Sequence, residues 1–313
     1  MVVTIPRLGL RYSFLLNGAL SMAALESSIT TLDPAASRRY FHAALSYYDA
    51  AHLAFRQYLP SVRKNTELQY SLYMFSALVV ALEMGIPLCG KAQGLPLREE
   101  KGEKGLLRQI EQLFDVQSGM VQLAFADYEG FARSDYGPAL VRANEVLKSP
   151  LVGGLAMSTE AALTRVKTVI EFGSEDKVVV YQAALESLRI CFVEEQRDTI
   201  KGLGLAYPSM VGKEFVELFK SGDDVALFVL MHWGVMLHRI GIFAWWATSF
   251  GQSLVRELSG KSMLSNAPQA ALPEWWESIA WVRNQVGLDQ GHGESTVSLA
   301  DLSLFPSTHV RHS

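Results

Sequence analysis

The sequence predicts an all-α protein with a single large domain of about ten helices. Apolar residues recur at steps of three and four through most of the 313 residues, no segment shows convincing β-alternation, and no linker rich in Pro or Ser divides the chain. The hydrophobic share of 49% is ample for a buried core. We expect this domain to cover residues 1–288, with an apolar pocket between its C-terminal helices, and residues 289–313 to form a disordered tail.

In the first half, a helix is predicted to begin at Asp33-Pro34, because Asp caps free amides and Pro suits the first helical position. Its apolar stripe is expected to end at Pro60 and consists of Phe41, Leu45, Tyr48, Phe55 and Leu59. The next helix is predicted over 66–84, ended by Gly85 and Pro87. An exposed loop over 90–105 and a helix over 106–128 follow.

The second half is predicted to continue as helices separated by short turns. Their expected positions are a short helix up to about 148 after the turn at 135–138, a helix from Ser158 or Thr159 to Gly173, a long one from Ser174, a short one over 211–219 after Tyr207-Pro208, one capped by Asp223 and Asp224, and a last one from Pro273. The run Val178-Val179-Val180 alone would suit a strand, but its periodic surroundings favour helix.

Charge and cysteine content exclude several classes of function. A net charge of -4 argues against nucleic-acid binding, which needs a concentrated basic face. Two cysteines, Cys89 and Cys191, are too few for a disulfide scaffold or a four-cysteine zinc site. Gly260-Lys261-Ser262 resembles the end of a phosphate-binding loop, but Val255 stands where that loop needs Gly. We therefore expect no metal and no cofactor.

Two segments approach the length of a membrane span, 70–88 and 227–246. The second contains His232, His238 and Arg239, and a charged residue in mid-bilayer costs roughly 2.5–3.5 kcal/mol. The first contains Glu83 near its end. We expect both to be buried core helices and the chain to have no membrane span.

His42, Asp49 and His52 share one face of the second helix. Metal ligands can be arranged in this way. However, seven residues of helix span roughly 10.5 Å, which is too far for one ion without other ligands. We therefore interpret the three as a solvated polar face.

The last third of the chain concentrates its aromatic residues, including all six tryptophans. Either these residues form a large core, or they line a pocket for an apolar molecule, with His232 or Ser249 as polar anchor. The predicted pocket residues are Phe228, Met231, His232, Val235, Trp245, Trp246, Ser249 and Phe250. The sequence leaves both interpretations open, because a pocket and a core have the same composition.

A family resemblance runs through residues 1–288. The residues that carry it are Ala226-Leu227, His232-Trp233, Leu237-His238-Arg239, Trp245-Trp246 and Val286-Gly287-Leu288, with 14–25 and 40–48 as the opening helices. Together they resemble the ligand-sensing regulatory region of fungal zinc-cluster transcription factors of the sterol uptake control type. The sequence departs from that pattern at Tyr207-Pro208, where the family has Trp-Pro, and at Trp281-Val282, where Pro is missing.

The resemblance implies a regulator that binds a sterol-like molecule or another apolar metabolite of polyketide or terpenoid type. It further implies control of sterol or secondary-metabolism genes, a homodimer, and a place in the nucleus or cytoplasm. In the family, a six-cysteine zinc cluster that binds DNA precedes this region. This chain has two distant cysteines, so we expect it to make no direct contact with nucleic acid.

Two other functions stay open. In one alternative, the chain is a stand-alone relative of this fold that acts as a cyclase or isomerase on an apolar metabolite. Its candidate acid or base groups are then Glu83, Asp127, His232 and His238. The other alternative is an interaction module that dimerises through an amphipathic helix.

Overall fold

The computed structural model describes residues 4–94, 104–134, 137–138, 141–142, 145, 154–173, 175–198, 200, 202–260 and 267–289. These residues form α-helices and short 3-10 turns, and no strand occurs among them, which confirms the all-α prediction. The α-helices are α1 (Thr4–Gly9), α2 (Ser13–Thr30), α3 (Pro34–Tyr58), α4 (Thr66–Ala92), α5 (Lys104–Phe125), α6 (Tyr128–Arg133), α8 (Met157–Glu171), α9 (Glu175–Arg197), α10 (Tyr207–Met210), α11 (Lys213–Lys220), α12 (Asp224–Ile240), α13 (Phe250–Gly260) and α15 (Pro273–Gln285). The 3-10 turns are η1 (Leu59–Lys64), η2 (Leu203–Ala206), η3 (Trp245–Ala247) and η4 (Pro268–Ala271).

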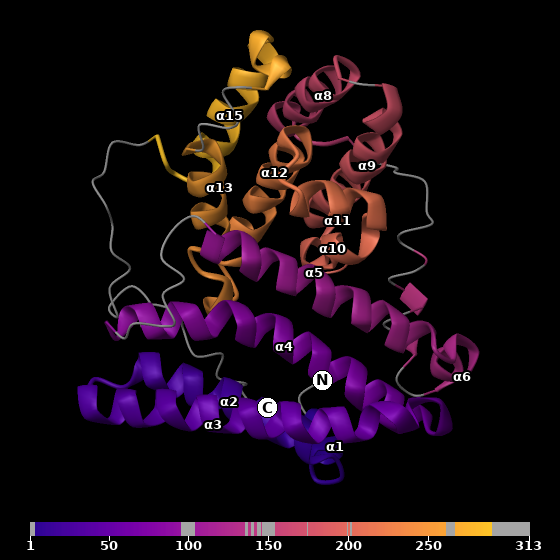
Figure 1. The fold of residues 1–313 in the computed structure, drawn as a ribbon. Helices are drawn as coiled ribbons and strands as arrows, with labels where there is room; N and C mark the ends of the chain where they lie inside the picture. The colour runs from indigo at the N-terminus through magenta and orange to yellow at the C-terminus, as the bar shows by residue number, and fades with distance from the viewer. Residues whose placement is uncertain are drawn as a thin grey trace.

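The helices are arranged in successive layers (Figure 1). The pair α2 and α3 forms one side of the molecule, α4 packs on that pair, and α5 packs on α4. The helices from α8 onward gather on the far side of α5, with α12 among them. Helices α4 and α5 therefore separate a small aromatic core beneath them from the main core around α12.

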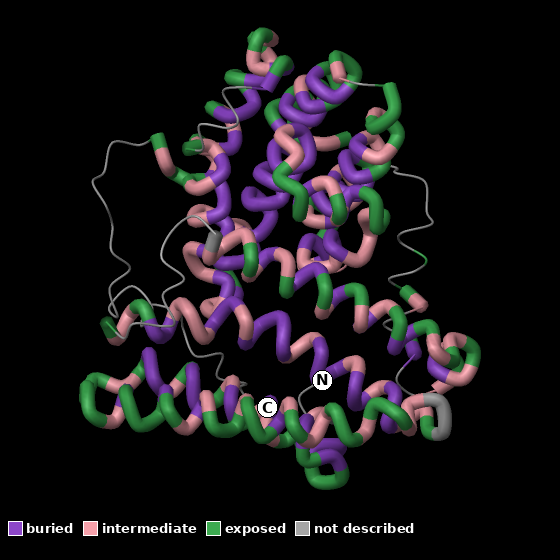
Figure 2. The backbone as a smooth tube through the Cα atoms, in the orientation of Figure 1, coloured by how far each residue is buried: buried purple, intermediate pink, exposed green. Residues whose placement is uncertain are grey.

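Helix α12 is the most completely buried element, as the continuous purple tube in Figure 2 shows. Its neighbour α13 approaches closely because glycines face each other at the crossing. A Cβ placed on Gly251 would lie 2.2 Å from the carbonyl oxygen of Gly234. The indole of Trp233 donates to the carbonyl of Gly204 at 2.7 Å, so its buried N–H group is satisfied. Asp223 caps the helix as predicted, accepting from the amide of Ala226 at 3.0 Å.

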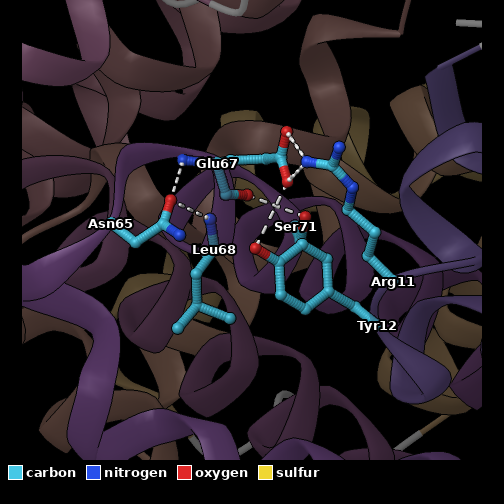
Figure 3. Close-up of polar contacts among 6 residues, drawn as sticks. All are labelled: Arg11, Tyr12, Asn65, Glu67, Leu68 and Ser71. Carbon is cyan, nitrogen blue, oxygen red and sulfur yellow. Dashed lines mark hydrogen bonds and ion pairs between the residues drawn. The ribbon is translucent and has the colours of Figure 1, made fainter.

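The start of α4 is fixed by a polar cluster (Figure 3). Asn65 accepts from the backbone amides of Glu67 and Leu68 at 2.8 and 3.2 Å, which satisfies two of the free donors of the first turn. The Glu67 carboxylate in turn accepts from Arg11 at 2.9 Å and from the Tyr12 hydroxyl at 3.4 Å. These contacts hold the beginning of α4 against the chain just before α2.

The predicted end of α4 is wrong, because the helix continues through Gly85 and Pro87 to Ala92. A Cβ on Gly85 would lie 3.2 Å from that of Trp246, so this glycine permits close packing and does not end the helix. The predicted loop over 90–105 is therefore helical at its start, and residues 95–103 lie outside those described.

By length and composition, α4 is the one helix among the described residues that is apolar enough to cross a membrane. In its most apolar stretch, 61% of the residues are buried against other helices of the protein.

Most other boundaries agree with the sequence prediction. Asp33 caps α3 by accepting from the amide of Ala35 at 2.9 Å, and Pro34 is the first residue of that helix. Helix α9 includes the three valines as predicted, and Pro273 begins α15. One boundary differs, since Tyr207 and Pro208 are themselves the first residues of α10. The expected tail from 290 onward lies outside the described residues.

Candidate functional site

A cavity with a volume of about 700 Å³ lies between described residues of the first half of the chain. It lies between α3, η1, α4 and α5, and we call it the α3–α4–α5 cavity. Its lining residues are His52, Phe55, Leu59, Val62, Phe75, Ser76, Val79, Val116, Gly119, Gln122, Leu123, Phe125 and Ala126. Most of these are apolar, as expected for a site that buries a small organic molecule.

The floor of the cavity is buried and its rim is partly exposed. Phe75, Val79 and Leu123 are buried, and the rings of Phe55 and Phe75 lie 5.0 Å apart. Phe125 is 55% exposed at the end of α5. The two helices of the floor are joined directly, because the buried side chain of Gln69 donates to the carbonyl of Leu123 at 2.7 Å.

Three polar side chains line the cavity: His52, Ser76 and Gln122. Ser76 donates its hydroxyl proton to the carbonyl of Leu72 at 3.0 Å, within its own helix. Gln122 is exposed at the rim. The imidazole of His52 is different, since its Nε2 is buried and has no hydrogen-bond partner among the described residues. A buried polar atom without a partner is costly, so Nε2 would gain a hydrogen bond if the imidazole shifted to meet a polar group in the cavity that His52 lines.

Behind His52 lies a pair of polar side chains that joins α3 to α4. The Tyr48 hydroxyl donates to the Glu83 carboxylate, and the Tyr48 ring lies 4.4 Å from the imidazole of His52 in an edge-to-face arrangement. Burial, and next the Glu83 charge, raise the pKa of Tyr48, so this hydroxyl stays protonated. Burial lowers the pKa of His52, which outweighs the opposing effect of Glu83, so the imidazole is neutral at pH 7.

The interpretation of His42, Asp49 and His52 as one solvated face is right for two of them. His42 and Asp49 are exposed on α3, whereas His52 turns toward the cavity. No group of three His, Cys, Asp or Glu side chains that could hold a metal ion occurs among the described residues.

Four of the sequence-predicted pocket residues belong to the core around α12. Phe228, Met231, His232 and Val235 are all fully buried. The Nδ1 of His232 bonds the Phe228 carbonyl at 2.8 Å, and the Phe228 ring stacks on Trp275 at 4.2 Å. None of the four lines the α3–α4–α5 cavity.

The other four follow α12 in the chain, in η3 and at the start of α13. Trp245 and Trp246 are half-buried in η3 and pack against Gly85 of α4. His232, one of the first four, instead stacks its imidazole on Trp281 of α15. Ser249 has a positive φ of 65° just before α13, where Phe250 is buried. Phe250 and Trp246 belong to the same core as Phe228, Met231 and Val235, and none of the eight lines the α3–α4–α5 cavity.

The remaining acid–base candidates have structural surroundings. Asp127 is exposed and caps α6, accepting from the amide of Gly130 at 3.0 Å. His238 is half-buried near the end of α12, and burial, with the neighbouring charge of Arg239, lowers its pKa. Of the four, Glu83 is the one that contacts a neighbour of the cavity residue His52, through Tyr48.

A second cavity, of about 460 Å³, lies between α9, η2 and the end of α12. It contains charged side chains, among them Arg239, which is paired with Glu195 and donates to Gln285 at 2.9 Å. This paired charge lines the wall, so the second cavity is less suited to an apolar ligand than the α3–α4–α5 cavity.

Sequence reasoning missed the apolar wall of the α3–α4–α5 cavity. The one signal was the position of His52 between Tyr48 and Phe55 on the apolar stripe of α3.

Comparison of the chain with protein-family models, with curated proteins and with solved structures finds no match in any of the three.

Proposed function

We propose that this chain binds an apolar small molecule in the α3–α4–α5 cavity and acts as a ligand-sensing regulatory domain. The observation that carries this proposal is the cavity of about 700 Å³, with apolar walls and one unpartnered imidazole nitrogen. Sites for small organic molecules measure about 300–1,000 Å³ and combine apolar walls with few polar groups. We place the site here and not around His232, because the His232 side chain is enclosed in packed core.

The regulatory part of the proposal rests on the sequence resemblance. A sterol-like, polyketide-like or terpenoid ligand fits the apolar walls, and control of sterol or secondary-metabolism genes by a homodimer in the nucleus or cytoplasm follows the resemblance. Sensing requires the ligand to bind one conformation better than another. The cavity walls come from helices of three successive layers, so a ligand in it stabilises the arrangement in which α3, α4 and α5 surround it.

Uptake of Nile red, a neutral apolar dye, tests whether the cavity binds such molecules. We expect the full chain to bind the dye with increased fluorescence, and Val79→Trp, which fills the cavity, to weaken binding about tenfold or more. Val179→Trp is the matched control, because Val179 is 73% exposed on α9. Circular dichroism checks that each variant folds. If Val79→Trp does not fold, Val116→Trp serves in its place, because it fills the same cavity from α5. Equal binding by wild type and the folded cavity variants would show that the dye binds elsewhere.

A second candidate function is an enzyme that cyclises or isomerises an apolar substrate. The observation that favours it is the contact of Glu83 with Tyr48, next to a neutral His52 that faces the cavity. A neutral imidazole in an apolar site is suited to act as a general base. Mass spectrometry of a bound metabolite distinguishes the two functions: unchanged recovery supports a sensor, and a rearranged product supports an enzyme.

A further inference from the structure

The charge around the α3–α4–α5 cavity limits the kind of ligand that it accepts. None of the described side chains that line the cavity carries a positive charge. The carboxylate of Glu83 lies one helical turn after Val79 on α4. Its charge, like that of Asp49, opposes the lowering of the His52 pKa by burial. Arg56 is exposed on α3, and its charge has the opposite effect on His52. A carboxylate brought to the inner wall therefore meets a like charge and no lining cation.

The hydrogen-bonding capacity of His52 limits the ligand further. In a neutral imidazole, one ring nitrogen donates and the other accepts, so Nε2 offers either a proton or a lone pair. A hydroxyl group can donate and accept, and so it can satisfy Nε2 in both tautomers. An ether oxygen can only accept, and satisfies one of them.

From these two observations we infer that the α3–α4–α5 cavity selects a neutral apolar alcohol, whose hydroxyl bonds the Nε2 of His52 when the imidazole shifts toward it. The inference rests on the proposed function, because it describes the ligand of the same cavity. The polar end of the ligand lies beside the imidazole and its hydrocarbon part contacts the floor formed by Phe75, Val79 and Leu123. The Tyr48–Glu83 pair is a positioning element, since Tyr48 packs its ring against the imidazole.

Displacement of Nile red by three probes of equal chain length tests this inference. The probes are dodecan-1-ol, dodecyl methyl ether and dodecanoate, added to the full chain at pH 7.5. We expect dodecan-1-ol to displace the dye at the lowest concentration. In His52→Phe, its affinity should fall about threefold to tenfold, the equivalent of one hydrogen bond. His42→Phe is the matched control, because His42 is exposed on the same helix.

Glu83→Gln tests the charge without altering the imidazole. This substitution keeps an acceptor oxygen for Tyr48, and we expect the affinity for dodecanoate to rise severalfold relative to the affinity for dodecan-1-ol. An affinity for dodecan-1-ol that is the same in wild type and folded His52→Phe would overturn the inference, and so would a wild-type preference for dodecanoate. In both cases dye uptake shows that the cavity still binds apolar molecules. Failure of the chain to take up Nile red would overturn the proposed function together with the inference.

Discussion

The buried imidazole of His232 makes the stability of this protein depend on pH. Burial, together with the charge of Arg165, lowers the pKa of His232 to about 4 from an ordinary value of 6.5, although its bond to the Phe228 carbonyl opposes the change. In the unfolded chain the imidazole takes up a proton near pH 6.5, whereas in the folded chain it stays neutral until about pH 4. Acid therefore favours the unfolded chain between these two values.

The magnitude follows from the two pKa values. Their difference corresponds to about 3 kcal/mol of unfolding free energy once the pH is below both. Between pH 7 and pH 5 the expected loss from His232 alone is about 2 kcal/mol. The stabilisation is complete above pH 6.5 and decreases as the pH falls toward 4, which is the direction for a group whose pKa is lower in the folded state.

Urea unfolding of wild type and His232→Leu at pH 7 and pH 5 measures this loss. Leucine has a similar volume and does not titrate, so the variant should lose about 2 kcal/mol less than wild type over this range. Comparing the two proteins is necessary because burial also lowers the pKa values of His52 and His238, which contribute to the wild-type loss. An equal decrease in both proteins would refute the assignment of this pH dependence to His232.

Two further predictions concern packing and capping. Gly251→Ala should prevent folding at 37 °C, because its methyl group would overlap backbone atoms of α12. Gly119→Ala places its methyl group in open space and should add about 0.5–1 kcal/mol of unfolding free energy. Thermal unfolding followed by circular dichroism compares the two variants. Asp223→Ala should cost about 2 kcal/mol in urea unfolding, because Asp223 caps α12 and also accepts from Lys177 and Tyr181 at 2.9 and 2.8 Å. A loss below 0.5 kcal/mol would contradict this role, and Asp224→Ala is the control because Asp223 provides the cap.

The sequence was sufficient to predict the fold class and most helix starts, because these depend on local chemistry. Asp33 and Asp223 carry capping oxygens, and their amide partners lie two and three residues further along the chain. The end of α4 was predicted wrongly, because Gly85 and Pro87 usually end helices. Here the close contact of Gly85 with Trp246, a residue far away in the sequence, decides the outcome. Long-range packing of this kind has no local signal.

The candidate site was harder to predict than the fold, for a related reason. The residues of the α3–α4–α5 cavity come from segments up to about seventy positions apart, and an apolar side chain that lines a cavity has the same helical spacing as one that fills a core. The concentration of aromatic residues in the last third predicts a pocket at Phe228 and His232, but both side chains are buried in the main core. His52 was assigned to a solvated face because its polar neighbours His42 and Asp49 are exposed. The packing of α3 against α4 is what turns His52 toward the cavity and leaves His42 and Asp49 exposed.

Helix α5 connects the proposed binding site to the main core. One side of it lines the cavity through Val116 and Leu123. On another side, the buried side chain of Gln117 donates to the carbonyl of Leu205 in η2 at 2.9 Å, and Asp115 pairs with Lys220 of α11 at 2.8 Å. A ligand that changes the position of α5 must therefore also change or break contacts with η2 and α11. For the ligand-sensing function that we propose, these contacts are the connection between the cavity and the helices around α12 that a change of conformation would have to use.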